Sequence, residues 1–402
     1  MRYLGNKTKL LPEIEAFATA KGARGEVFLD AFAGTSAVGA AFKERGYIVH
    51  GCDLLTSSFV SQVALLEVNR APRFRGLLGM KSYRRGLNSR TFEAELEALP
   101  RGTPRELGRA VTLLDSLVEP EEGLIFRHYA PSGEHGRKYY RDEHARALDG
   151  KLNRLREWWR EGRLSRGEFH LLLYAVLDAA DRVANIAGVY AAYLKNWQSN
   201  TRGSLALRPP EIIHGPRGFA HQGDINELIA ELECDILYLD PPYNTRQYAA
   251  YYHVREVMAE LHEVDDLDAY EASLYGKTGM RPYDDLKSDY CVRRKKDGRP
   301  ACEQAFLELI ERSRARHIIV SYNEEGIISR ETICEALAKV SGRAEFDPRD
   351  HRAVGYKRFR SDANGRNGRR YQVLDGKGAD RVDEWLFYAK SDERRLRRAR
   401  RA

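Results

Sequence analysis

Residues 240–243, which read Asp-Pro-Pro-Tyr, have the types and spacing to do chemistry on an aromatic amine. They follow the apolar run 236–239, which predicts a buried strand that ends at Asp240. Prolines fix φ, and the residue before a proline favours an extended backbone, so the carbonyls would point in set directions. Asp240 could meet an exocyclic amine while Tyr243 stacks on its ring. The alternative is a strand followed by a proline turn, with the aspartate capping the next segment.

The tetrapeptide resembles the catalytic signature of the amino-methyltransferases, which methylate the exocyclic amine of adenine or cytosine with S-adenosylmethionine. This resemblance implies catalytic roles for Asp240, Pro241, Pro242 and Tyr243. It also implies that the chain contains a site for the cofactor.

A candidate cofactor site precedes the tetrapeptide. Residues 26–30 are predicted to form a short buried strand, and a turn of small residues through Gly34 leads into a helix at 37–45. A second strand, 47–52, ends at Asp53, at the distance from Asp30 where doubly wound folds place an acid for ribose hydroxyls. A plain turn explains Gly34 as well as a ligand does.

This turn resembles that of the Dam-like adenine methyltransferases, which carry an acid-x-Phe-x-Gly-x-Gly motif. Asp30, Phe32 and Gly34 match the motif, whereas Ser36 stands where the second glycine is usual. The tightness of the turn is therefore open to question.

Two further segments match the same family. Residues 2–11 resemble its opening motif, whose aromatic residue and lysine lie against the cofactor, and residues 223–225 occupy the place of its adenine-binding segment. Asp224 would also serve as a helix cap. The resemblance implies a cofactor site formed by Tyr3, Gly5, Asn6, Lys7, Asp30, Phe32, Gly34, Asp53, Asp224, Ile225 and Asp240.

The composition favours a phosphate-bearing partner. The 402 residues carry a net charge of +7, and arginine, which pairs bidentately with phosphate, dominates the cations. Many basic proteins nevertheless bind no nucleic acid.

The five cysteines are odd in number and widely separated, so we expect neither a disulfide framework nor a zinc site, and no other metal. No transmembrane run, signal segment or lipidation motif is visible, and we expect a cytoplasmic, bacterial-type, nucleoid-associated protein without membrane contact.

The long interval between Asp53 and Asp240 predicts an insertion into the sheet. Leu148, Leu152 and Leu155, and then residues 169–180, repeat apolar side chains at helical spacing, so at least two packed helices are expected there. The predicted fold is α/β: a Rossmann-like S-adenosylmethionine-dependent methyltransferase sheet in residues 1–65 and 213–402, with a largely helical insert at 66–212.

Two later segments complete the predicted sheet. Residues 317–323 read as a buried parallel strand that matches a family motif lining the target-base pocket, and Ser321 would share the carboxyl edge with Asp30, Asp53 and Asp240. Residues 383–388 resemble the closing strand of the methyltransferase sheet, which pairs antiparallel in a terminal hairpin.

The motif order is that of the Dam-like (alpha) group of site-specific DNA adenine-N6 methyltransferases, restriction-modification type, in which the insert helps to read the target. Segments 139–149, 185–195 and 288–291 resemble members of this group. The resemblance implies base flipping in double-stranded DNA and a possible cognate restriction endonuclease. The cations that we expect to contact DNA are Lys195, Arg202, Arg246, Arg293, Arg294, Lys295 and Lys296.

Three other functions remain open. The first is an RNA methyltransferase acting on adenine or guanine, against which the long insert argues. The second is a cytosine-amine methyltransferase, which more often carries Ser in place of Asp240. The third is a catalytically silent nucleic-acid-binding module, which would not need intact Lys7, Asp53, Asp240 and Tyr243.

Overall fold

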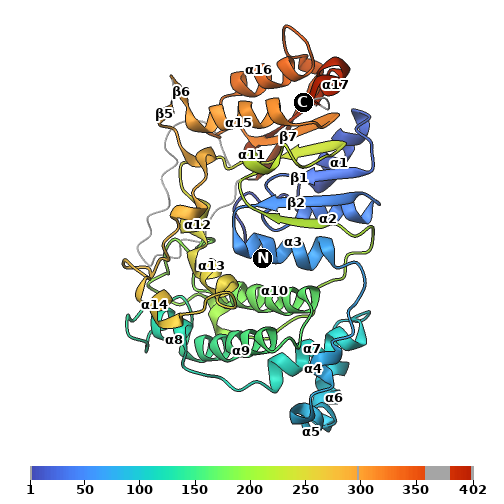
Figure 1. Ribbon diagram of the computed structural model, residues 1–402. Coiled ribbons are helices and arrows are strands. Elements are labelled where there is room, and N and C mark those ends of the chain that lie inside the picture. The colour runs from blue at the N-terminus through green and yellow to red at the C-terminus, as the bar shows by residue number, and fades with distance from the viewer. Residues whose placement is uncertain (1, 297, 358–380, 400–402) are drawn as a thin grey trace. The chain divides into compact units, whose positions relative to one another are not determined.

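The computed structural model describes residues 2–296, 298–357 and 381–399 (Figure 1). The chain divides into two compact units. The first unit comprises Met1–Asn6, Ala33–Gln222 and Tyr248–Lys287, and the second comprises Lys7–Phe32, Gly223–Gln247 and Ser288–Ala402. The protein is a mixed α/β structure with a mostly parallel sheet of seven strands, which confirms the predicted fold class.

The second unit holds five strands of this sheet. In spatial order they are β1 (Val27–Asp30), β4 (Ile236–Leu239), β7 (His317–Asn323), β9 (Arg381–Lys390) and β8 (His351–Lys357). The first three are parallel, and β9 runs antiparallel to both β7 and β8. The predicted strands at 236–239 and 317–323 and the predicted closing hairpin are therefore confirmed.

The central strands of the second unit are buried along their whole length. All four residues of β4 and all seven of β7 are buried, as expected for parallel strands covered on both faces. The other elements of this unit are α1 (Leu11–Ala20), α11 (Ile225–Leu228), η5 (Asp289–Cys291), β5 (Lys295–Lys296), β6 (Arg299–Pro300), α15 (Ala301–Arg312), α16 (Arg330–Val340), η6 (Pro348–Asp350) and α17 (Glu393–Ala399). Helices α1 and α16 both contact β9.

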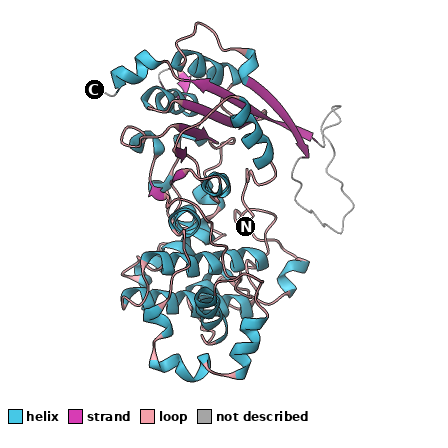
Figure 2. Ribbon diagram, turned by 90° about the vertical axis from the view of Figure 1, so that its right-hand side faces the viewer, coloured by secondary structure: helices cyan, strands magenta, loops and turns pink. Residues whose placement is uncertain are grey.

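The first unit contains the parallel pair β2 (Ile48–Asp53) and β3 (Phe219–Gln222) and many helices, drawn in cyan in Figure 2. Helix α2 (Ala37–Glu44) and strand β2 lie within one residue of their predicted bounds. The helices that follow are α3 (Thr56–Gln62), the π-helix η1 (Val63–Glu67), α4 (Arg75–Leu78), η2 (Lys81–Tyr83), α5 (Arg84–Leu87), α6 (Arg90–Glu97), α7 (Arg105–Ser116), α8 (Leu124–Tyr129), α9 (Asp142–Arg160), α10 (Arg166–Val183), η3 (Ser199–Arg202), α12 (Tyr248–Tyr251), α13 (His253–Glu260), α14 (Leu267–Ala272) and η4 (Asp284–Leu286).

Helices α9 and α10 pack against each other where the leucine spacing predicted two helices. Leu148, Leu152 and Leu155 are buried in the core of the first unit. Helix α10 begins with a capping box, in which Ser165 and Glu168 satisfy each other's backbone N–H groups. The assignment of residues 66–212 to a target-recognition domain stays a prediction.

Within the part of the chain that the structure describes, no helix combines the length and the apolar character that crossing a lipid bilayer requires. All five cysteines carry free thiols.

Candidate functional site

Three charged side chains from distant parts of the chain meet in the second unit. Lys7 Nζ lies 2.8 Å from Asp240 Oδ1 and 2.8 Å from Glu384 Oε1. Asp240 follows the last residue of β4, Glu384 lies on β9, and Lys7 precedes α1. The side chains of Lys7 and Glu384 are 6% and 1% exposed, whereas that of Asp240 is 16% exposed. The cluster therefore carries two carboxylates and one ammonium group, and its aspartate reaches the surface.

Burial shapes the ionisation of this cluster. Loss of solvent raises the pKa of Asp240 from its ordinary value of 3.8 to about 7; the Lys7 ammonium opposes this rise and the Glu384 carboxylate adds to it. Burial alone would lower the pKa of Lys7, but Asp240 and Glu384 raise it well above its ordinary value. Lys7 therefore stays charged, and Asp240 is a carboxylate poised to exchange a proton near neutral pH.

The end of β7 supports the tetrapeptide. The Tyr322 hydroxyl donates a hydrogen bond to the Pro242 carbonyl at 3.3 Å and accepts one from the Ile328 N–H at 3.0 Å. No described residue donates a hydrogen bond to the Pro241 carbonyl. One proline carbonyl is thus held in place, and the other remains an acceptor beside Asp240. Tyr243 is half-buried.

A second group of predicted residues meets in the first unit. The Tyr3 ring stacks on Tyr252, with centroids 4.6 Å apart and planes inclined by 7°, and the Tyr252 hydroxyl accepts a hydrogen bond from the Leu4 N–H at 2.7 Å. Gly34 donates its N–H to Asp53 Oδ2 at 2.8 Å. The opening motif therefore packs against Tyr252, and the glycine turn meets the end of β2.

Asp53 is an acceptor-rich group at the end of β2. Its Oδ1 also accepts the Leu55 N–H at 2.9 Å, so each carboxylate oxygen has one backbone donor. Burial raises the pKa of Asp53 to about 6, although these two hydrogen bonds lower it. An ionised carboxylate has a second lone pair on each oxygen, and these free acceptor positions suit a ligand that donates hydrogen bonds from hydroxyl groups.

Gly34 lies at a position where a residue with a side chain would strain the backbone and collide with Tyr3. Its φ is +50°, and a Cβ built on it would lie 2.9 Å from Tyr3 Cε1. The Tyr3 ring thus touches the turn directly, which explains why a glycine is needed here. The Tyr3 ring therefore occupies the space that a side chain at position 34 would need.

Replacing Gly34 by alanine is expected to lower the free energy of unfolding by about 2–3 kcal/mol, because left-handed strain adds to the contact with Tyr3. Gly162 has a similar φ of +66°, and a methyl group added there would meet nothing within 4 Å, so Gly162→Ala isolates the backbone strain. Urea unfolding of both variants measures the difference. Equal losses would show that Tyr3 does not constrain the turn.

Ser36, which stands where the family motif usually has its second glycine, has an unusual backbone conformation. Ser36 holds a left-handed conformation with φ of 60° and ψ of 22°, which glycine adopts without strain. Its side chain is fully buried, and its Oγ has no hydrogen-bond partner among the described residues. The turn thus has a left-handed backbone at this position, with a strained serine where the family motif has a glycine.

Other predicted cofactor residues lie in the second unit. Phe32 packs edge-on against Tyr290, with ring centroids 4.8 Å apart, and the Tyr290 hydroxyl donates to Asn226 Oδ1 at 2.7 Å. Asp224 caps α11 by accepting the Asn226 N–H at 2.8 Å, so the capping role is realised. Asp30 and Ile225 are buried.

The remaining two predicted cofactor residues belong to the opening motif in the first unit. Asn6 is exposed, and Gly5 turns the chain with a φ of 81°.

The cations that we predict to contact DNA lie in both units. Lys195 and Arg202 in the first unit, and Arg246, Arg293 and Arg294 in the second, are exposed. None of these five is ion-paired with a carboxylate of a described residue, and their role in DNA binding stays a prediction. The side chains of Lys295 and Lys296 lie outside the described residues.

Sequence reasoning missed three residues that shape these sites. The sequence marks Glu384 only as part of a closing strand and Tyr252 only as one aromatic among several; neither belongs to a motif that signals its contact. Asn185 is fully buried, donates to the Lys138 and Leu194 carbonyls and accepts the Gln198 N–H. This asparagine holds the loop that carries Lys195.

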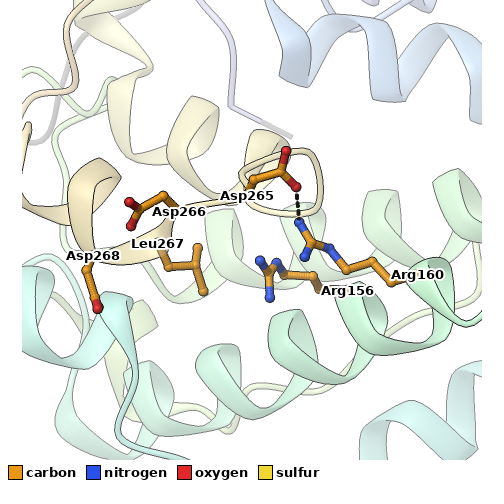
Figure 3. Close-up of a pocket in the computed structure, with 6 residues that line it drawn as sticks. All are labelled: Arg156, Arg160, Asp265, Asp266, Leu267 and Asp268. Atoms are coloured by element: carbon orange, nitrogen blue, oxygen red, sulfur yellow. Dashed lines mark hydrogen bonds and ion pairs between the residues drawn. The ribbon is translucent and has the colours of Figure 1, made fainter.

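A hollow of about 490 Å³ lies elsewhere in the first unit (Figure 3). Arg156 and Arg160 of α9 line it together with Asp265, Asp266, Leu267 and Asp268. Both arginines donate to the Val264 carbonyl at 2.8 Å, and Arg160 also pairs with Asp265 at 2.9 Å. No predicted site residue lines this hollow. Among the described residues no group of three or more His, Cys, Asp or Glu side chains is arranged to hold a metal ion.

Comparison with known proteins finds a family model and relatives that are all named as methyltransferases or methylases. The family of D12 class N6 adenine-specific DNA methyltransferases matches residues 3–84 and 125–334. Type II methyltransferase M.FokI of Planomicrobium okeanokoites is 32% identical over 98% of this chain and 53% of its own length. Modification methylase StsI of Streptococcus sanguinis is 31% identical over 93% of this chain and 51% of its own. This chain thus spans about half the length of these two relatives.

A shorter relative is matched almost completely. Type II methyltransferase M.NlaIII of Neisseria lactamica is 32% identical over 90% of this chain and 93% of its own length. No solved structure matches the chain significantly. The matched family residues include the glycine turn, the tetrapeptide and β7. The chain therefore belongs to the D12 class N6 adenine-specific DNA methyltransferases, a family whose chemistry requires a methyl donor and DNA.

Proposed function

We propose that this protein transfers the methyl group of S-adenosylmethionine to the N6 amine of an adenine that it flips out of double-stranded DNA, at a specific site. The observation that carries the proposal is the Lys7–Asp240 ion pair at the end of β4, which places an ionisable carboxylate at the head of the Asp-Pro-Pro-Tyr segment. The relatives are named as type II methyltransferases and modification methylases, which favours a restriction-modification system with a cognate endonuclease, in the cytoplasm.

The chemical difficulty is the weak nucleophilicity of the adenine amine, whose lone pair is delocalised into the ring. Asp240 and the Pro241 carbonyl would accept the two amine hydrogens, which lets the nitrogen become tetrahedral and direct its lone pair outward. As the new C–N bond forms, the bond between the methyl carbon and the sulfonium sulfur would break and leave a neutral thioether. The nitrogen would gain the positive charge, which the Asp240 carboxylate would stabilise. The proton that the nitrogen then loses can pass to Asp240, whose pKa of about 7 suits proton uptake.

The residues proposed to hold the cofactor provide suitable groups. Asp53 would accept hydrogen bonds from ribose hydroxyls, the turn at Gly34 would lie beside the cofactor with the Tyr3 ring packed on it, and Phe32 would contact the adenine ring. Tyr3, Gly5, Asn6, Lys7, Asp30, Asp224, Ile225 and Asp240 complete the proposed set. When bound, S-adenosylmethionine supplies an electrophilic methyl group on a sulfonium sulfur.

DNA binding would rely on the exposed cations of both units. Lys195, Arg202, Arg246, Arg293 and Arg294, together with Lys295 and Lys296, would contact backbone phosphates and make affinity fall steeply with salt. Extrusion of the target nucleotide costs a few kcal/mol, which stacking and edge contacts in the pocket offset. Pro242 and Tyr243 would form the wall on which the base lies.

Replacing Tyr243 by alanine is expected to weaken capture of the extruded base by about 1–3 kcal/mol, because one stacking face is lost. Tyr243→Phe keeps the ring and is expected to retain most of the activity. A 2-aminopurine at the target position reports base extrusion by fluorescence. Equal fluorescence in the wild type and the alanine variant would exclude Tyr243 as the stacking partner.

The function is tested by incubating the protein with methyl-labelled S-adenosylmethionine and, separately, with genomic DNA, total RNA or no nucleic acid. We expect label on N6 of adenines within one short DNA sequence. Label in RNA alone would support an RNA methyltransferase instead. Cofactor and DNA binding without transfer would indicate a silent binding module, and label on cytosine would change the target base.

A further inference from the structure

Glu384 is a buried carboxylate that no motif of the sequence explains. It lies on β9, opposite Asn323 of β7, and is 1% exposed. Its Oε1 accepts hydrogen bonds from Lys7 Nζ at 2.8 Å and from Ser321 Oγ. Its Oε2 is buried and has no hydrogen-bond partner among the described residues.

Such an arrangement is a poor way to stabilise a fold. A buried ionised carboxylate is expensive unless both oxygens are satisfied, and replacement by apolar residues is often neutral or stabilising. Lys151 and Asp115 in the first unit show the simpler pairing, in which a buried lysine meets one carboxylate at 3.3 Å and no second acid among the described residues. The second carboxylate on Lys7 therefore calls for a reason other than stability.

The geometry supplies that reason. Lys7 Nζ lies between Glu384 on the buried side and Asp240 on the side that reaches the surface, as the exposures of 1%, 6% and 16% show. Glu384 is itself fixed by Ser321, which is fully buried on β7. Because Glu384 holds the Lys7 ammonium group from a second side, the flexible lysine side chain is less free to swing away from Asp240. Asp240 in turn has one carboxylate oxygen, Oδ1, committed to Lys7.

We propose that Glu384 is a positioning residue for methyl transfer: with Ser321 it anchors Lys7, and Lys7 fixes the orientation and the charge of Asp240. The inference rests on the proposed function of Asp240 as the acceptor of the amine hydrogens. Glu384 does not touch the reacting atoms and acts only through Lys7.

The role of Glu384 can be measured through the ionisation of Asp240, which depends on the charged groups around it. The titratable groups that face it within the second unit are Lys7, Glu384, Tyr238 of β4 and Tyr322 of β7. Burial raises the pKa of both tyrosines, so they stay neutral through the physiological range. Lys7 stays charged over the same range, so removing the charge of Glu384 while Lys7 is kept changes the field at Asp240.

The test compares Glu384→Gln, Glu384→Ala and the wild type in the full chain. Glutamine keeps an acceptor for Lys7 and Ser321 but removes the charge that raises the pKa of Asp240. The acid limb of the kcat profile is therefore expected to move about one unit toward lower pH, with kcat at high pH within roughly threefold of the wild type. Alanine removes the anchor, and kcat is expected to fall about 10–100-fold. The glutamine variant thus rescues the alanine variant.

Asp115→Asn is the matched control, since it removes the partner of another buried lysine and is expected to leave the acid limb in place. An unmoved acid limb in Glu384→Gln, or wild-type kcat in Glu384→Ala, would overturn the inference. If the alanine variant does not fold, the glutamine variant still decides.

If the wild type itself methylates no DNA, the proposed function is wrong, and this result is distinct from a failure of the inference about Glu384. In that case, carbon NMR titration of the Asp240 carboxyl measures whether Glu384→Gln lowers its pKa, independently of any activity.

Discussion

Replacing Asp240 by asparagine is expected to reduce methyl transfer at least about a thousandfold, because an amide holds the amine hydrogens weakly and cannot take up the proton. The fold should survive: Lys7 keeps Glu384 as a partner, and the cluster becomes neutral. Because burial raises the pKa of Asp240 from 3.8 to about 7, its ionisation lowers stability as pH rises through this interval. Asp240→Asn is therefore expected to have a higher Tm than the wild type above pH 7.

Single-turnover transfer of labelled methyl groups and thermal unfolding at pH 5 and pH 8 check both parts. Asp350 pairs with Lys21 at 2.9 Å far along the chain from the tetrapeptide, and Asp350→Asn serves as the control, with unchanged turnover. Wild-type turnover in Asp240→Asn would remove this residue from the chemistry. Lost cofactor binding in the same variant would show that Asp240 also helps to hold the cofactor, as proposed above.

Replacing Lys7 by methionine is expected to have the largest effect on stability, about 3–5 kcal/mol at pH 8, because two buried carboxylates lose their shared counter-ion. Lys7 holds the pKa of Asp240 down against burial, so its loss raises that pKa further. An acid with a raised folded-state pKa contributes full stability below its unfolded value and loses it as pH rises through the folded value. The deficit is thus expected to be small below about pH 4 and to grow through pH 7.

Urea unfolding of Lys7→Met across this pH range measures the deficit, and the acid limb of its residual activity should move to higher pH. Lys151→Met, which leaves a single carboxylate, is the matched comparison and should lose less. A pH-independent deficit in Lys7→Met would mean that the loss comes from packing and not from charge.

The sequence predicted the strands well because their apolar runs are long enough to need burial on both faces. Residues 236–239 and 317–323 have no face that is polar throughout, and a central position in a parallel sheet satisfies them. Helices α9 and α10 were predictable for a related reason, since leucines at helical spacing leave one apolar face to pack.

The charged cluster was only half visible in the sequence. Lys7 and Asp240 each belong to a motif, although nothing in either motif says that the two side chains pair. Glu384 is separated from both by a long stretch of chain, and its neighbours Trp385 and Leu386 describe an ordinary strand. Only the pairing of β9 with β7, a long-range event, turns this glutamate toward the lysine.

The division of the chain has a practical meaning for protein engineering. The backbone passes between the two units five times, after Asn6, Phe32, Gln222, Gln247 and Lys287. No single proteolytic cut or truncation can therefore release either unit as one continuous polypeptide. Chimaeras that exchange internal stretches of the first unit among relatives would need two junctions for each stretch. They would also have to keep the segment in which Tyr3 and Lys7 are four residues apart yet belong to different units.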